Sequence, residues 1–458
     1  MTATAPDPPS GAPSAAGRPR GPVEVFLPDT YTTGVPYATF RELRRTGPVC
    51  WIDEPAVGPW PPGPGYWAVF RHRDVKRVLR SPDVFSSYLG ATQIRDPDTE
   101  RDLEFVRAMM LNQDPAPPTA EGTPRGHSRL RRIVAAAFTP RAVRELESVI
   151  EARARALVAE VAADGRTDFV ALAADLPVWT LAHLMGVPER DRRLLFDWAD
   201  RVIGYQDAEH ARSDTAATGD LSPMGRAAIA HRPATLTRPD GRPVNPRSRE
   251  ALSDMFGYAH ALAERPRPGS VLARARQGGL TRDEFENMFF LFAVAGNETL
   301  RNGIPGGLLT LLDHPGQHAL LLRRPELVDG AVEEMLRHWP PVIHFRRTAT
   351  RDVELGGRLI RRGEKVVVYH ASANRDETVF TDPDRFDITR PNAGDHLSFG
   401  HGPHFCPGAR LARVQMRAML RGTLQGLPGL RRDGPAVRLT SNFQNGLKHL
   451  PVRWETDR

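Results

Sequence analysis

The segment that most constrains the fold and chemistry of this chain is residues 399–410, FGHGPHFCPGAR. Its glycines let the backbone turn tightly and approach a bulky group closely. Pro407 favours the first turn of a helix, so Cys406 should lie where a helix begins. Free backbone amides at a helix start stabilise a thiolate. The loop therefore predicts a thiolate ligand, with a buried structural cysteine as the alternative.

Cysteine usage excludes two other kinds of site. The chain of 458 residues contains two cysteines, Cys50 and Cys406, so it is no disulfide scaffold. A zinc site needs several cysteine or histidine ligands at suitable spacing, and His401 and His404 beside one cysteine fit that poorly. A single thiolate held in this way suits the axial position of a haem iron.

A second informative segment precedes this loop by about a hundred residues. Residues 288–296 contain no charge and predict a buried helix. Asn297, Glu298 and Thr299 then place polar groups in that helix, which costs free energy unless they have partners or a chemical task. We expect Gly296 to let a flat ligand approach the helix backbone. The alternative for Thr299 is a hydrogen bond to a carbonyl of its own helix.

Phe399, Gly402, His404, Cys406 and Gly408 together resemble the haem-binding loop of cytochrome P450s. The resemblance implies that Cys406 ligates the iron of haem b, and thiolate ligation favours O–O bond cleavage. Residues 295–299 (AGNET) are similar to the acid-alcohol motif of the family. By that similarity Thr299 would hydrogen-bond dioxygen and Glu298 would help relay protons.

Basic side chains are expected to hold the two propionates of haem b (iron protoporphyrin IX). The family positions imply His127 and Arg131 on one helix face, Arg347 rather than Arg346, and His404. The cofactor-binding residues that the resemblance implies are His127, Arg131, Ala295, Arg347, Phe399, His404, Cys406 and Gly408. A further set, Glu334, Arg337 and Arg390, is similar to the family's Glu-x-x-Arg element and should stabilise the fold.

Hydrophobic periodicity predicts a mainly α fold with a minor β region, and the resemblance implies that this is the cytochrome P450 fold. Residues 1–22, rich in Pro, Ala, Gly and Ser, predict a disordered tail, and residues 23–458 a single catalytic domain. Residues 213–249 lose helical periodicity and predict a long inserted loop or lid. No apolar run suits a membrane span or a signal peptide, so we expect a cytoplasmic protein.

Three stretches are similar to actinobacterial members that oxidise steroid side chains or methyl-branched lipids: residues 85–92, 295–302 and 441–449. The implied function is a monooxygenase that hydroxylates a hydrophobic small molecule, such as a steroid, a terpenoid or a branched lipid. Insertions at 116–126 and 213–249 fall where the family shapes substrate entry. They keep an alternative competitive, which is the tailoring of an antibiotic-type natural product, either free or bound to a carrier protein. An alternative of another class is a haem-thiolate protein that binds a ligand without turnover.

Electrons would come from a ferredoxin and a ferredoxin reductase that uses NAD(P)H, because no reductase domain is visible in the 458 residues. The net charge is +7, with 62 basic and 55 acidic residues. No dense basic run interleaved with aromatics supports a nucleic-acid partner. Arg129, Arg132, Arg410 and Arg413 are candidates for a basic docking face, and ordinary helix arginines are the alternative. We expect a monomer.

Overall fold

The computed structural model describes residues 18–96, 99–115, 126–203, 206–207, 220–237, 241 and 244–456. The α-helices are α1 Tyr37–Thr46, α2 His72–Arg80, α3 Glu100–Arg107, α4 Gly126–Ala135, α5 Pro140–Val161, α6 Phe169–Met185, α7 Arg192–Ile203, α8 Pro223–Ile229, α9 Ser253–Glu264, α10 Val271–Gln277, α11 Arg282–Leu312, α12 Pro315–Arg323, α13 Val328–His338, α14 His370–Ala373 and α15 Ala409–Gly426. The strands are β1 Val49–Ile52, β2 Tyr66–Val69, β3 Phe85–Ser86, β4 Arg166–Asp168, β5 His344–Ala349, β6 Val353–Leu355, β7 Arg358–Ile360, β8 Lys365–Tyr369, β9 Arg431–Arg432, β10 Val437–Arg438, β11 Leu447–His449 and β12 Pro451–Arg453.

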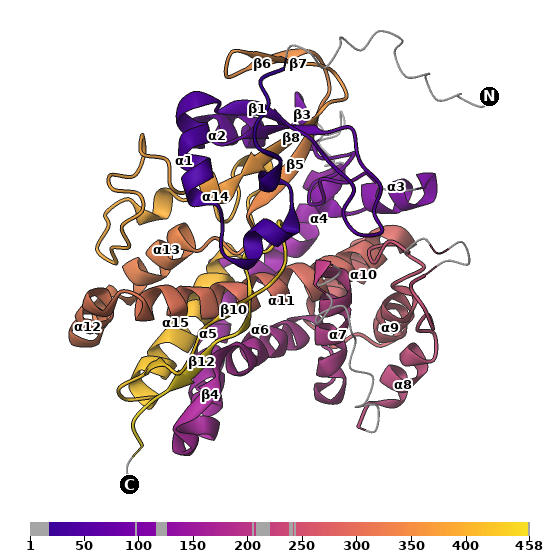
Figure 1. The fold of residues 1–458 in the computed structure, drawn as a ribbon. Coiled ribbons are helices and arrows are strands. Elements are labelled where there is room, and N and C mark those ends of the chain that lie inside the picture. The colour runs from indigo at the N-terminus through magenta and orange to yellow at the C-terminus, as the bar shows by residue number, and fades with distance from the viewer. Residues whose placement is uncertain are drawn as a thin grey trace.

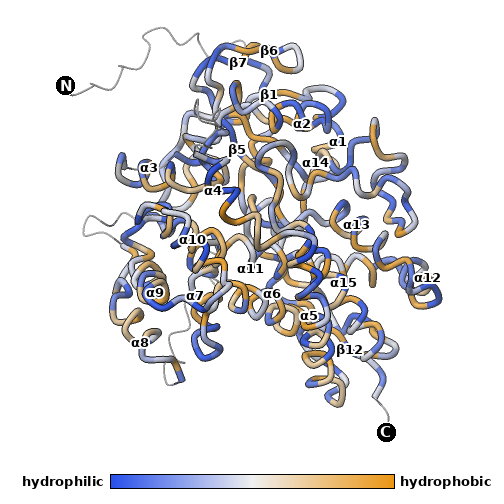
Figure 2. Tube along the Cα trace, turned by 180° about the vertical axis from the view of Figure 1, so that it is seen from behind, coloured by the Kyte–Doolittle hydropathy of each residue, from blue (hydrophilic) through white to orange (hydrophobic). Residues whose placement is uncertain are grey.

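The long helix α11 crosses the middle of the molecule, with α5, α6 and α15 on one side (Figure 1). Its start is fixed by a capping box, in which Thr281 and Glu284 each bond the other's backbone amide. Figure 2 shows α6 largely in the hydrophobic colour, as expected for a helix packed between others. In the described part of the chain, no helix combines the length and apolarity needed to cross a membrane.

Two glycines of α11 mark close helix contacts. A Cβ on Gly296 would lie 2.8 Å from Cδ2 of Leu181 in α6, so Gly296 admits a neighbouring helix. The expectation that it admits a flat ligand is therefore wrong. A Cβ on Gly306 would lie 2.0 Å from Nε1 of Trp339, so this glycine lets the end of α13 pack against α11. Helix α11 continues through Pro305, which lies beside that contact.

The largest sheet has five strands in the order β1-β2-β8-β5-β3, and only β2 and β8 are parallel. It lies at the opposite end of the molecule from α8 and α9 (Figure 1). His344 at the start of β5 and His370 in α14 are fully buried, and no described residue bonds either nitrogen of either ring. Burial lowers the pKa of both imidazoles to about 3.

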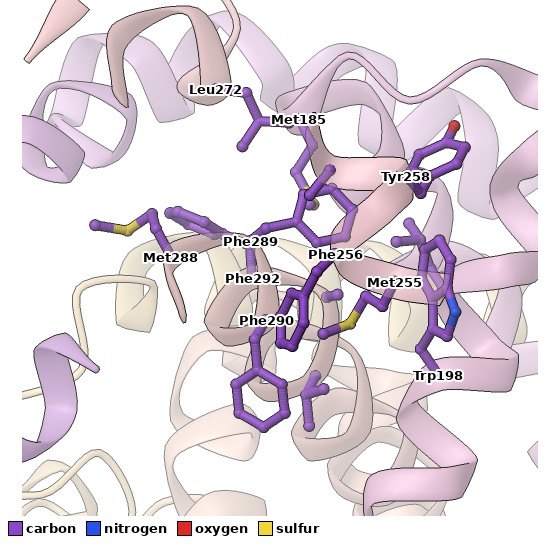
Figure 3. Close-up of a cluster of buried hydrophobic side chains, with 14 of the residues drawn as sticks. Met185, Trp198, Met255, Phe256, Tyr258, Leu272, Met288, Phe289, Phe290 and Phe292 are labelled. Atoms are coloured by element: carbon purple, nitrogen blue, oxygen red, sulfur yellow. The ribbon is translucent and has the colours of Figure 1, made fainter. Parts of the chain in front are cut away.

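The helical half has an aromatic and sulfur-rich core. Phe289 of α11 lies close to Trp198 of α7 and Tyr258 of α9 (Figure 3), with ring centroids 5.9 and 6.2 Å away. Trp198 also donates its indole N–H to Asp254, 3.1 Å away. Burial of this many large side chains fixes how α6, α7, α9, α10 and α11 pack.

The predicted tail of residues 1–22 is wrong for its last five residues. Arg20 forms a bridge with Trp51 of β1, and the Gly21 amide donates to the Trp51 carbonyl at 2.9 Å. Arg18 lies 2.6 Å from Glu364 and 4.0 Å from the centroid of the Trp51 ring. Residues 1–17 lie outside the described part of the chain.

The segment predicted as a long loop, residues 213–249, contains helix α8 in its described part. Ser222 caps α8, and its amide and hydroxyl both donate to the buried carboxylate of Asp191, at 2.9 and 2.5 Å. Arg232 contacts Asp254 at 3.1 Å, and Arg249 forms an ion pair with the buried Glu286 of α11. Helix α8 has seven residues, which is too short to produce a clear hydrophobic period. The carboxylates that bind this segment, those of Asp191, Asp254 and Glu286, belong to other elements. Residues 213–219 lie outside the described part.

Candidate active site

The cysteine loop is a tight turn packed on α2. The Cys406 amide donates to the Phe399 carbonyl at 2.9 Å, and the Phe405 amide to the Gly402 carbonyl at 3.0 Å. Gly400 and Gly402 have φ of 72° and 74°, the left-handed region that glycine tolerates best. A Cβ on Gly402 would lie 2.7 Å from the Leu79 carbonyl oxygen, so the loop depends on glycine there.

The thiol of Cys406 sits at the N-terminus of α15. Burial raises its pKa, and the amides of Gly408 and Ala409 together with the charges of Arg131 and Arg413 oppose that rise. A bound iron would add the positive charge that deprotonates a coordinating thiol outright. Cys50 in β1 has no such surroundings, and burial raises the pKa of its thiol to about 12.

Helix α11 is buried on nearly every side but has one open face. Ala295 is exposed and Thr299 is partly exposed, although Ala293, Val294 and Leu300 around them are buried. Ala295 and Thr299 are four residues apart and therefore share a face. An open strip within a buried helix is what a flat cofactor needs in order to lie against it.

The acid-alcohol pair points to two different networks. The Thr299 hydroxyl donates to the Ala295 carbonyl at 2.9 Å, which is the local bond that we considered as the alternative. Glu298 is 3.1 Å from Arg301, which also forms an ion pair with Asp200 of α7. Burial raises the pKa of Glu298, the charge of Arg301 opposes this, and Asp200 adds to it.

The four predicted propionate-binding residues are brought together. The rings of His127 and His404 have centroids 4.4 Å apart, and the charges of Arg131 and Arg347 act on His404. Burial, followed by the charge of Arg131, lowers the pKa of His127 to about 4. Burial, followed by the charge of Arg347, lowers the pKa of His404 to about 2. Burial also lowers the pKa of Arg347 to about 10.

Within the described part of the chain, neither Arg131 nor Arg347 forms an ion pair. Arg347 is buried and Arg131 is partly buried, and guanidinium groups withdrawn from water without an ion-pair partner are costly. This cluster is therefore suited to an anionic ligand. Two propionates would supply the missing negative charges. Arg346, which we considered the weaker candidate, instead pairs with Asp96 at 2.5 Å. The donor set therefore fits haem b.

The predicted structural trio is confirmed. Arg337 contacts Glu334 through two hydrogen bonds of 2.7 Å, and both side chains are fully buried. Arg390 reaches the same carboxylate at 3.3 Å. Arg337 also donates to the carbonyls of Asn374 and Pro383, which ties the segment before the cysteine loop to α13. Phe399 packs against the Arg413 guanidinium, 4.5 Å from the ring centroid.

Sequence reasoning missed the acid nearest to the basic cluster. Asp114 accepts hydrogen bonds from the backbone amide and hydroxyl of Ser87, at 2.9 and 3.0 Å, and the Ser87 hydroxyl lies 3.2 Å from Nε2 of His404. Only the spatial pairing of residues 86–87 with residue 114 reveals this link. Arg301 was also missed, although its position three residues after Glu298 is a helix ion-pair spacing.

A cavity of about 180 Å³ opens between the N-terminal segment, residues 92–95 and the turn at 441–443. By the resemblance to the family, the substrate pocket would draw on residues 86–112, Phe292, Ala295, 342–344 and 442–444. Thr92, His344, Asn442 and Phe443 do line this cavity, whereas Phe292 and Ala295 do not. His344 and Phe443 contact through their rings, with centroids 5.4 Å apart.

The sequence profile of the cytochrome P450 family matches residues 321–427. A steroid C26-monooxygenase of Rhodococcus jostii is 35% identical over 94% of this chain and 84% of its own length. Linalool 8-monooxygenase of Pseudomonas putida is 35% identical over 93% of this chain and 97% of its own. A methyl-branched lipid omega-hydroxylase of Mycobacterium tuberculosis is 34% identical over 91% and 90%.

Solved structures agree with the sequence relatives. A cytochrome P450 of Mycobacterium marinum in complex with pseudoionone superposes with a TM-score of 0.77. It is 32% identical in sequence, and the match covers 96% of this chain and all of the other. Together with the cysteine loop and its basic cluster, these similarities show that this chain belongs to the cytochrome P450 family.

Proposed function

We propose that this cytochrome P450 monooxygenase hydroxylates a hydrophobic molecule of the steroid, terpenoid or branched-lipid type, with electrons from a ferredoxin. The observation that carries the proposal is the open strip at Ala295 and Thr299 of an otherwise buried α11. Relatives named for steroid, linalool and methyl-branched lipid oxidation support the substrate class. The aromatic rings of Phe26, Trp60 and Phe443 at the 180 Å³ cavity suit an apolar molecule.

The haem, once bound, supplies the activation of O₂ and the oxidising chemistry. The protein supplies a thiolate at Cys406, held by two backbone amides, and an anion-binding cluster formed by His127, Arg131, Arg347 and His404. Because the two histidines are neutral, they can donate hydrogen bonds without adding further charge. We propose that Arg131 and Arg347 provide the charges that the propionates need.

We propose that Thr299 and Glu298 deliver protons at the open face of α11. The Thr299 hydroxyl already donates to the Ala295 carbonyl, so its oxygen is oriented to accept a hydrogen bond from the open face. Glu298 has a raised pKa because it is buried, so it can hold a proton near neutral pH better than an exposed glutamate. Arg301 and Asp200 connect this carboxyl to α7 and limit its orientations.

Two of the four arginines proposed for ferredoxin docking remain good candidates. Arg132 and Arg410 are exposed and have no ion pair within the described part of the chain. Arg129 instead pairs with Glu284, and Arg413 with Glu333 at 2.8 Å. We propose that Arg132 and Arg410 attract an acidic ferredoxin to the face of the molecule beside the cysteine loop.

The test is a titration of the ferric holoprotein with a steroid ketone, a methyl-branched fatty acid and a macrocyclic natural product. A saturable low-spin to high-spin Soret shift with the steroid or the branched lipid is the expected result. A shift with the macrocycle alone would instead support the tailoring alternative. Turnover with a surrogate ferredoxin and NADPH then separates an enzyme from a ligand-binding protein, because only an enzyme forms hydroxylated product.

A further inference from the structure

A second cavity, of about 200 Å³, lies away from the cysteine loop. It is lined by the C-terminal end of α11, the end of α13, residues 34–37, Arg438 and Asn445. Thr310 at its wall is eleven residues beyond Thr299 on the same helix, a separation of about 16 Å along the axis. The two sites can therefore be occupied independently.

Arg438 is the unusual residue of this cavity. Its Nε donates to the Tyr31 carbonyl at 3.2 Å, and its Nη2 to Oδ1 of Asn445 at 2.5 Å. The described part of the chain offers no partner to Nη1 and no carboxylate in ion-pair contact with this guanidinium. The side chain is partly buried, and this burial lowers its pKa. A partly buried cation that lacks a counter-ion favours a ligand that supplies one.

The other charges around the cavity do not compensate Arg438. Asp313, the carboxylate in its lining, is paired with Arg432 at 2.7 Å. Arg375 is paired with Asp384 at 3.0 Å, and Arg41 shares that same carboxylate. The guanidinium groups of Arg375 and Arg41 thus share the single negative charge of Asp384. Arg375 therefore adds positive charge to the cavity wall. The net electrostatic preference of the cavity is for an anion.

Aromatic rings determine which anion fits. The Arg438 guanidinium lies 4.6 Å from the centroid of the Trp339 ring, and the Arg375 guanidinium lies 3.9 Å from that of Tyr37. His314 and His338 complete the aromatic part of the lining. A volume of about 200 Å³ is below the usual range of drug-sized pockets, which favours a small planar molecule.

We propose that this cavity binds a small aromatic carboxylate, whose carboxylate pairs with Nη1 of Arg438 and whose ring lies among Tyr37, Trp339 and the two histidines. The site is separate from the haem site and is independent of the proposed substrate. Its ligand would act as an effector or as a stabiliser of the fold, because it bridges α11, α13 and the N-terminal segment.

The experiment is isothermal titration of benzoate into the holoprotein, with an imidazole inhibitor bound at the iron so that the haem site is closed. We expect one saturable site, and weaker binding of inorganic phosphate, which cannot use the aromatic walls. Arg438→Gln should weaken benzoate binding about tenfold or more, since it removes the charged partner. Arg431→Gln, an exposed arginine of β9 outside the cavity lining, is the matched control and should bind like the wild type.

Asn445→Asp gives a second variant that keeps Arg438 and the fold. Nδ2 of Asn445 is buried without a hydrogen-bond partner in the described part of the chain, so an isosteric carboxylate loses no bond there. The introduced carboxylate would pair with the Arg438 guanidinium. We therefore expect benzoate binding to be abolished and the melting temperature to rise. The proposal is overturned if wild-type protein does not bind benzoate, or if both variants bind it as tightly as the wild type.

Discussion

Cys406 and Cys50 are both enclosed thiols, but only Cys406 has backbone amides and two arginines acting on its sulfur. A Cβ on Gly408 would lie 3.9 Å from Sγ of Cys406, which is ordinary van der Waals contact, so Gly408 acts on the thiol through its backbone amide. At this scale the sequence was highly informative. Five fixed positions in ten residues specified the loop, and two of its glycines, Gly400 and Gly402, adopt the positive φ values that glycine tolerates best.

The first prediction compares the two cysteines. Cys406→Ala should remove the axial thiolate, so the reduced carbon monoxide complex should lose the long-wavelength Soret band of a thiolate-ligated haem. Cys50→Ala should retain that band, since its thiol lies in β1 and has a pKa of about 12. Difference spectra of the two purified variants provide the measurement. Retention of the band by Cys406→Ala would show that Cys406 is not the iron ligand.

Thr299 provides the second prediction. Thr299→Ala removes the hydroxyl that donates to Ala295, and we expect product formation to fall by about 10²-fold while NADPH is still consumed. Thr299→Ser retains the hydroxyl and should recover most of the coupling between NADPH oxidation and product formation. The ratio of product formed to NADPH oxidised is the measurement. An unchanged ratio in Thr299→Ala would show that the hydroxyl has only its local helical role.

At the scale of elements, periodicity predicted the helices well and the loops poorly. Residues 288–296 were predicted as a buried helix, and the structure places them inside α11. Residues 213–249 were predicted as a loop, because the seven-residue α8 is too short to produce a clear period. The described part of residues 213–249 is held by the carboxylates of Asp191, Asp254 and Glu286. These carboxylates lie on other elements, and no local sequence pattern connects them with the segment.

Asp191 gives the prediction at this scale. It is fully buried and accepts hydrogen bonds from Ser222 and from the Tyr258 hydroxyl at 2.8 Å. Asp191→Asn should lower stability by about 1–3 kcal/mol, because it leaves buried donors without acceptors. It should also speed proteolysis near α8. Asp220→Asn, at an exposed neighbouring position, should change neither thermal unfolding nor cleavage. Equal behaviour of the two variants would contradict an anchoring role.

At the scale of the whole molecule, the basic cluster is a group of residues that could be identified from the sequence only by comparison with the family. His127, Arg347 and His404 are more than two hundred residues apart at the extremes and meet only in the folded chain. Their similarity to family positions identified them. Asp114 and Arg301 also contact residues of the site. No local pattern marked Asp114, whereas the spacing of Arg301 from Glu298 was a signal that the motif comparison did not use.

The electron-donor face yields a whole-molecule prediction. Reversing both charges in Arg132→Glu/Arg410→Glu should slow ferredoxin-dependent reduction, by about tenfold at low salt and less at high salt. Arg431→Glu changes the charge of an exposed arginine in β9 and should leave the rate unchanged. Stopped-flow reduction at several ionic strengths is the measurement. Equal rates for both variants at low salt would contradict docking at Arg132 and Arg410.

The buried histidines make stability depend on pH. The pKa of His344 and His370 is about 3 in the folded chain and about 6.5 when unfolded, so the folded state binds fewer protons between these values. Each ring should therefore remove about 1.4 kcal/mol of stability per pH unit as the pH falls below 6.5. His344→Phe should make the dependence of the melting temperature on pH shallower, and His231→Gln, at an exposed position, should not. Parallel curves for all three proteins would contradict this assignment.

At these two rings, protons thus behave as a ligand that prefers the unfolded chain. Among the described residues, His344 and His370 have no hydrogen-bond partner for their ring nitrogens, so the denatured ensemble binds protons there more tightly than the native state does. Acidification would then favour denaturation by mass action, even if every native contact remained intact.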